Sequence, residues 1–162
     1  MEVKIVLNRG ELLYDCSNRA YVEADVMEVG QHGRHHLFDI SDEGNVDIVG
    51  RIMDLTFARC VELCFPYSKK EIEEPERDNA LCDDDEYVLS LNIPDGFSET
   101  TVRLLNKVVH ELMVCRVMEY FVSVAKPERT PFYREKGDLL EADLSAALNA
   151  RTGRVRRPLA PF

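Results

Sequence analysis

Alternating apolar and polar positions predict two short strands. Val3, Ile5 and Leu7 occupy every second position near the start of the chain, a spacing that places them on one face of a strand. The same alternation recurs over residues 87–93, where aromatic and aliphatic side chains share one face and polar ones mostly the other. Each strand is therefore expected to bury one side only.

Apolar residues at helical spacing predict four helices, over residues 9 to about 30, about 45 to 65, 98–125 and 130–150. The first has Asn8 as its N-cap and Glu11 three positions later, as in a capping box. Either Asp42 or Asn45 can cap the second, and Ser98 caps the third. Thr130 should cap the fourth helix with its hydroxyl, because Pro131 suits the first helical position.

The third predicted helix changes its polar face halfway along. Its polar residues occupy one arc in the first half (Arg103, Asn106, Lys107, His110 and Glu111) and the opposite arc in the second (Arg116, Glu119 and Ser123). Such a helix must lie between other elements or between subunits. We take this as favouring an assembly, and the alternative is the central helix of a compact monomer.

The fourth predicted helix has an apolar side and a polar side. The apolar side is expected to hold Phe132, Leu139, Leu140, Leu144, Ala147 and Leu148. Arg134, Glu141, Ser145 and Asn149 are expected to face solvent. Together these elements indicate a mainly α fold, with one helical domain over residues 1–150.

Charge is concentrated in two segments. The chain has a net charge of −10, and residues 71–86 hold nine acidic residues against a single arginine, a net charge of −8. They belong to an expected extended acidic excursion over residues 66–97, between the second and third helices. The last segment, residues 151–162, is a basic tail with four arginines and no acid. This asymmetry predicts complementary contacts with neighbouring chains or other charged partners.

Residue types capable of catalysis or metal binding do not form a convincing site. His32, His35 and His36 lack the regular spacing of a zinc site, and an interface or solvated loop is the preferred interpretation. Cys60 and Cys64 lie one helical turn apart on an apolar face, where thiols pack as small hydrophobic groups. We therefore expect a protein that is not an enzyme and that needs no cofactor or metal.

Apolar runs are too short for a membrane span, and the N-terminus lacks a signal-peptide pattern. A protein made in the cytosol, without membrane contact, is expected.

The order of elements resembles the head-to-tail connector (adaptor) proteins of tailed bacteriophages, of the kind found in Bacteroides phages. The resemblance covers residues 8–162 and is closest over residues 45–55, residues 97–107 and the arginine-rich end. It implies a four-helix connector-like bundle, located in the virion and assembled in the bacterial cytoplasm. About a dozen copies would form a cyclic ring between the portal protein and the tail proteins. DNA would pass through it without sequence-specific binding.

The expected interface and channel residues follow from these interpretations. The subunit or partner interface is predicted to include Arg116, Glu119, Arg151, Arg154, Arg156, Arg157, Leu159 and Phe162. The resemblance implies an acidic loop facing the channel, with Glu71, Glu73, Glu74, Asp83, Asp84, Asp85 and Glu86. Carboxylates there would repel the DNA backbone. The alternative function is a non-enzymatic adaptor or regulatory protein that binds a protein partner through its acidic loop and basic tail.

Overall fold

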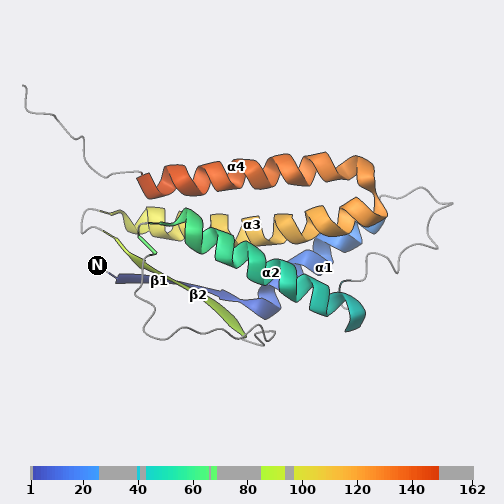
Figure 1. Ribbon diagram of the computed structural model, residues 1–162, viewed down its shortest axis with the longest axis horizontal. Coiled ribbons are helices and arrows are strands. Elements are labelled where there is room, and N and C mark those ends of the chain that lie inside the picture. The colour runs from blue at the N-terminus through green and yellow to red at the C-terminus, as the bar shows by residue number, and fades with distance from the viewer. Residues whose placement is uncertain are drawn as a thin grey trace, which may run out of the picture.

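The computed structural model describes residues 2–25, 40, 43–65, 67–68, 85–93 and 97–149. These residues form a mainly helical fold with a small antiparallel sheet (Figure 1). The elements in chain order are β1 (Glu2–Asn8), α1 (Arg9–Asp25), α2 (Glu43–Leu63), β2 (Glu86–Asn92), α3 (Glu99–Ala125), the short 3-10 helix η2 (Pro127–Arg129) and α4 (Thr130–Asn149). The predicted mainly α fold with four helices and short strands is confirmed.

Both predicted strands are present and pair with each other. β1 runs antiparallel to β2, with Ile5 opposite Leu89 and Val6 opposite Val88. Ile5 and Leu89 are buried, as the alternation predicted, whereas Val6 and Val88 are exposed on the other face. The sheet therefore covers the helices with one side and turns the other to solvent.

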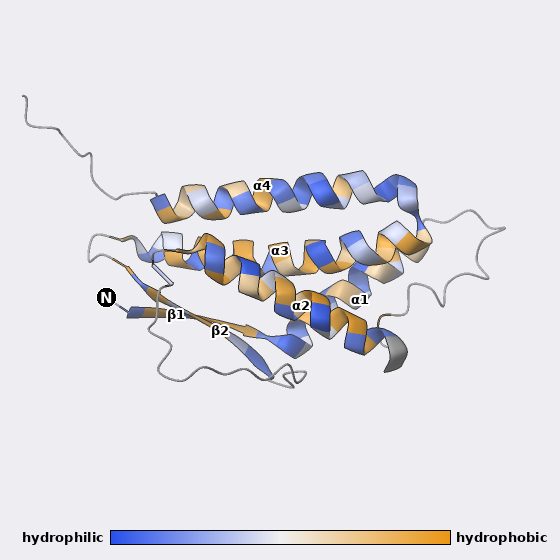
Figure 2. Ribbon diagram, in the orientation of Figure 1, coloured by the Kyte–Doolittle hydropathy of each residue, from blue (hydrophilic) through white to orange (hydrophobic). Residues whose placement is uncertain are grey.

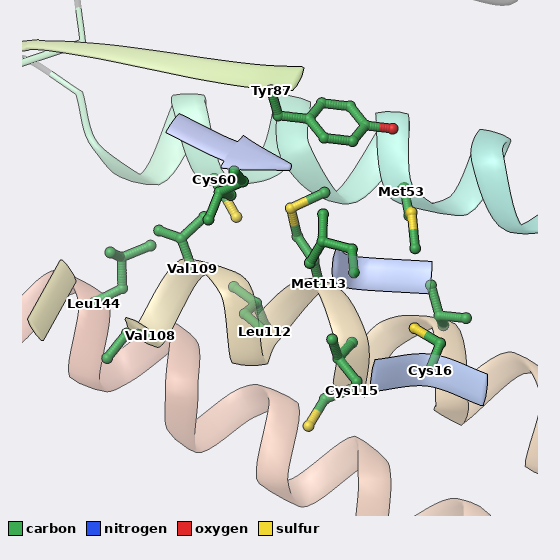
Figure 3. Packing of buried hydrophobic residues seen from close by; sticks show 14 of the residues in the cluster. Cys16, Met53, Cys60, Tyr87, Val108, Val109, Leu112, Met113, Cys115 and Leu144 are labelled. Atoms are coloured by element: carbon green, nitrogen blue, oxygen red, sulfur yellow. The ribbon is translucent and has the colours of Figure 1, made fainter. Parts of the chain in front are cut away.

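α3 is the central element of the core. It lies between α4 on one side and α2 with the strands on the other (Figures 1 and 3). Val109 and Met113 point toward α2 and the strands, whereas Val108 points toward α4 (Figure 3). At its start the backbone N–H of Thr100 donates to the Ser98 side chain at 3.2 Å, which confirms the predicted N-cap.

The change of polar face along α3 is explained within the chain itself. α1, α2, β1 and α4 all pack against this helix, and it buries eleven of its residues. The pattern allowed either an assembly or a central helix within one chain. In the structure, α3 is a central helix covered by its own chain. The change of face therefore gives no support to an assembly.

The buried face of α4 differs from the predicted one at two positions. Phe132 and Leu139 are 48% and 66% exposed, and Tyr133 and Gly137 are buried in their place. In this orientation Glu141, predicted to face solvent, accepts a hydrogen bond from Arg116 of α3. Figure 2 shows how polar α4 is compared with the elements below it.

The predicted cap of α4 is also wrong in one respect. The helix begins at Thr130, but the hydroxyl of Thr130 has no hydrogen-bond partner among the described residues. Thr130 has a helical backbone conformation (φ −56°, ψ −44°), whereas a capping residue needs a non-helical one. The 3-10 turn of η2 leads into the helix instead. The Asn8 cap is present, since the backbone N–H of Glu11 donates to its side chain at 3.2 Å.

The predicted core thiols Cys60 and Cys64 are confirmed, and two further cysteines share their environment. Cys16, Cys60, Cys64 and Cys115 are buried and free. Burial raises the pKa of Cys16 and of Cys60 to about 12, and that of Cys64 to about 11. These thiols remain protonated at neutral pH, so they pack as hydrophobic groups.

Candidate functional site

A groove lies between α2, α3 and α4 on the surface of the described residues. It has a volume of about 450 Å³ and is open to solvent. Its lining residues are Ile52, Leu55, Thr56, Arg59, Arg116, Glu119, Tyr120, Ser123, Thr130, Arg134 and Glu141. The groove thus gathers residues from three helices.

Arg116 is the central charge of the groove. Its guanidinium donates to Glu119 at 2.9 Å, to Asp138 at 2.9 Å and to Glu141 at 2.7 Å. Burial lowers the pKa of Arg116, but the hydrogen bonds to these three carboxylates outweigh it and hold the pKa above its usual value. The side chain is therefore a fixed cation that joins α3 to α4.

Because Gly137 of α4 has no side chain, the guanidinium of Arg116 can occupy the space beside it. A Cβ at this position would lie 2.9 Å from Cζ of Arg116. Only glycine lets the α4 backbone come this close to the guanidinium without displacing it. Gly137 is therefore part of the site, although nothing in the sequence around it indicated this.

Two further arginines extend the network of charges to the rim of the groove. Arg134 Nε donates to Glu119 at 2.9 Å, and Arg59 lies 3.6 Å from Glu141. Both arginines are about half exposed or more. Because each carboxylate in the groove already has a cationic partner, the polar wall presents a balanced set of charges rather than a vacant ion site.

The lining of the groove also includes apolar groups. Leu55 is 74% exposed, Tyr120 is 42% exposed, and Ile52 belongs to the same lining. Exposed Leu and Tyr beside a polar rim are typical of protein contact surfaces. The arrangement can bind a peptide segment or a neighbouring surface with both apolar and charged groups.

Two other polar clusters join α1 to the rest of the bundle. Glu111 of α3 accepts from Arg19 of α1 and from Lys136 of α4. Glu23 of α1 accepts from Arg129 and from the Tyr133 hydroxyl, both at 2.9 Å. Each acid has its partners within the chain, so these clusters hold the helices together.

The pKa values of these acids reflect their partners. Burial raises the pKa of Glu23, but the hydrogen bonds from Arg129 and Tyr133 prevail and hold it below its usual range. Burial and the contact with Glu23 also raise the pKa of Tyr133 above its usual value. Glu23 is thus a buried carboxylate that stays ionised near neutral pH.

The predicted interface residues are partly placed by the structure. Arg116 and Glu119 both line the groove, where they bond to partners in their own chain. Asp85 and Glu86 are exposed where β2 begins. The other predicted interface and acidic-loop residues, and the three clustered histidines, lie outside the described residues.

No local pattern in the sequence indicated the groove directly. Leu55 was the available hint, because it departs from the apolar face of α2 that holds Val49, Met53 and Cys60. An apolar residue on a polar helix face is common on protein surfaces, so it could not be singled out without the position of Tyr120.

No set of three or more His, Cys, Asp or Glu side chains suited to a metal ion occurs in the described part of the chain. Within the same residues, no helix is both long and apolar enough to cross a membrane. Comparisons with protein-family models, curated proteins and solved structures gave no match.

Proposed function

We propose that the chain is a structural subunit of a tailed-phage virion, which forms a ring below the portal and joins the head to the tail. Residues of the groove and of the basic tail would carry the contacts between copies. The resemblance described above supplies the kind of assembly. The groove between α2, α3 and α4 supplies the observation on which the proposal depends.

The groove supports an interaction role because exposing its apolar side chains to water costs free energy. A partner that covers them would remove this cost. Leu55 and Tyr120 lie beside a wall whose charges are already paired. A partner that binds here buries apolar surface without leaving those charges unpaired. Such a surface suits a contact between proteins better than catalysis, because no activated nucleophile lies in it.

A ring needs two different surfaces on each copy, since a head-to-tail contact joins unlike patches. The basic tail, residues 151–162, is the proposed second surface, with Leu159 and Phe162 as apolar anchors and its arginines as cations. The acidic residues 71–86 would face the channel. Their carboxylates would keep DNA from adhering to the wall while it passes.

The test compares two leucines of similar exposure. Leu55→Asp places a charge in the groove, whereas Leu139→Asp places one on the outer face of α4, outside the groove. We expect the native mass of the unchanged protein, alone or mixed with portal rings, to correspond to a ring. Leu55→Asp should abolish this species and Leu139→Asp should keep it. Equal behaviour of the two variants would contradict the role of the groove.

The adaptor alternative makes a different prediction about salt. If the acidic segment alone binds a basic partner, capture of that partner should weaken steeply with ionic strength. A ring contact anchored by apolar residues should persist in the same buffers. Pull-down at low and high salt, followed by native mass measurement, separates the two functions.

A further inference from the structure

β1 has an open edge. In an antiparallel pair, residues alternate between those that bond the partner strand and those whose N–H and C=O groups point away from it. The backbone N–H of Arg9 donates to Asp85 O at 2.9 Å, which makes this pair a bonded one. In the register of this sheet, Val3, Ile5 and Leu7 bond β2 as well. The backbone groups of Lys4 and Val6 therefore point outward.

The two edges of the sheet are not equivalent. On the β2 side the backbone N–H of Asn92 donates to Tyr67 O at 2.7 Å, so the segment after α2 occupies part of that edge. On the β1 side, the outward groups of Lys4 and Val6 have no backbone partner among the described residues. The edge of β1 is thus open at both Lys4 and Val6, whereas the edge of β2 is partly occupied at Asn92.

An open edge of this kind is a site for pairing with another strand. A sheet of two strands is also the smallest possible, and it depends on the helices for its stability. Its solvent face carries Val6 and Val88, 44% and 46% exposed and directly opposite each other. Adding a strand beside β1 would satisfy the free amides and partly cover Val6.

We propose that the occupant is β1 of a second copy, paired antiparallel about a two-fold axis to give a four-stranded sheet. β1 has the longer open edge of the two described strands, because Tyr67 occupies part of the β2 edge, and in a two-fold contact β1 meets its own equivalent. This pairing is closed after two copies. It is therefore independent of the proposed ring, whose contacts join unlike surfaces.

The side chains select one register. Outward backbone groups pair only if even-numbered residues of β1 face even-numbered residues of the second β1. Placing Lys4 opposite Lys4 would set like charges against each other. Placing Lys4 opposite Val6 overlaps the strands completely, sets Glu2 opposite Asn8 and lets the Lys4 stem cover Val6.

The contact is expected to be weak. This register makes about six backbone hydrogen bonds, because the C=O of a capping residue such as Asn8 is used by its helix. Lys4 also discourages tight pairing, as charged residues on edge strands do. The dimer should therefore appear with rising protein concentration rather than persist on dilution.

Proline substitution tests the edge directly, because proline removes a backbone donor. At Val6 the donor that is lost points to the open edge of β1, so Val6→Pro leaves the bonds to β2 intact. Val88→Pro is the matched control, since Val88 faces Val6 in the sheet and its outward N–H points to the opposite edge. Circular dichroism and thermal unfolding check that both variants fold.

Sedimentation of the full chain, without portal rings, from micromolar to near-millimolar concentration should show copies pairing two by two as the concentration rises. Val6→Pro should raise the dissociation constant about 30-fold or more, since each dimer loses two donors and gains two clashes. Val88→Pro should leave it within a few-fold. If Val6→Pro does not fold, two other tests replace it. Lys4→Pro should weaken the dimer in the same way. In the unchanged protein, the amide of Val6 should be more protected from exchange as the protein concentration rises.

A monomer at every concentration, or equal weakening by both prolines, would overturn the proposal. Amide exchange of Val6 that is independent of concentration would do the same. Loss of the dimer in a Val6→Pro protein that still forms rings would support the β1 contact and show that ring formation uses other surfaces. If no rings form but a dimer that depends on Val6 is present, the β1 contact is supported and the proposed ring is refuted.

Discussion

Substituting Gly137 by alanine is expected to destabilise the protein, against the usual effect of this change in a helix. Gly to Ala inside a helix ordinarily stabilises by about 1 kcal/mol, because alanine has the higher helix propensity. Here the added Cβ would lie 2.9 Å from Cζ and Nη1 of Arg116. The guanidinium must therefore move away from the α4 backbone.

The size of the loss follows from the partners of Arg116. Its bonds to Glu119 and Glu141 are mostly shielded from solvent, whereas Asp138 is 65% exposed and contributes little. Weakening two part-buried, charge-assisted hydrogen bonds costs about 2–3 kcal/mol. After the helix gain of about 1 kcal/mol, the expected net effect is destabilisation by about 1–2 kcal/mol.

A double-mutant cycle separates the two contributions. In an Arg116→Ala background the guanidinium is absent, so Gly137→Ala should stabilise by the ordinary helix gain of about 1 kcal/mol. Denaturant unfolding of the four proteins gives both values and their coupling, expected at about 2 kcal/mol. Stabilisation by Gly137→Ala in the unchanged background would refute this description of the α3–α4 contact.

Three further outcomes follow from the structure. Glu23→Gln should cost about 1–3 kcal/mol at pH 7, because it weakens the bonds from Arg129 and Tyr133. Since the pKa of Glu23 is lowered on folding, its contribution is complete above the unfolded pKa and is lost as pH falls through the folded one. Denaturant midpoints of the two proteins should converge in acid, and a constant difference would contradict the pairing. Ser98→Ala should lower stability by about 1 kcal/mol through loss of the α3 cap, measured against Ser145→Ala, which removes no cap. Thiol labelling at pH 8 followed by mass spectrometry should leave Cys16 and Cys60 unmodified until the protein unfolds, because their pKa values are about 12; rapid native labelling would contradict their burial.

The sequence predicted elements well because their signals are local. The alternation in β1 and β2, the Asn8 and Ser98 caps and the length of α3 all depend on neighbouring residues. The pairing of β1 with β2 was not predicted. It joins segments about eighty residues apart, and no short-range pattern specifies which strands meet.

The wrong buried face of α4 involves contacts between residues far apart in the sequence. Phe132 and Leu139 were placed in the core because they are apolar, but they are exposed in the orientation in which Glu141 bonds Arg116. A helical pattern with apolar residues on several sides permits more than one buried face. The partner across the interface decides between them.

Arg116 and Glu119 were predicted at an interface. They lie in the lining of the groove, and their place at an interface stays a prediction. Their partners on α4 could not be derived, because these ion pairs join residues 15 to 25 positions apart. The exposed Leu55 belongs to the same surface, and only the packing of three helices brings it there.

The proposed ring is tested most directly by native mass spectrometry of the full chain, alone and after addition of the portal protein of the same genome, with electron microscopy of the same samples. The proposal predicts a closed ring of about a dozen copies, free or seated on the portal. Monomers or dimers under every condition, with no binding to portal rings, would contradict it.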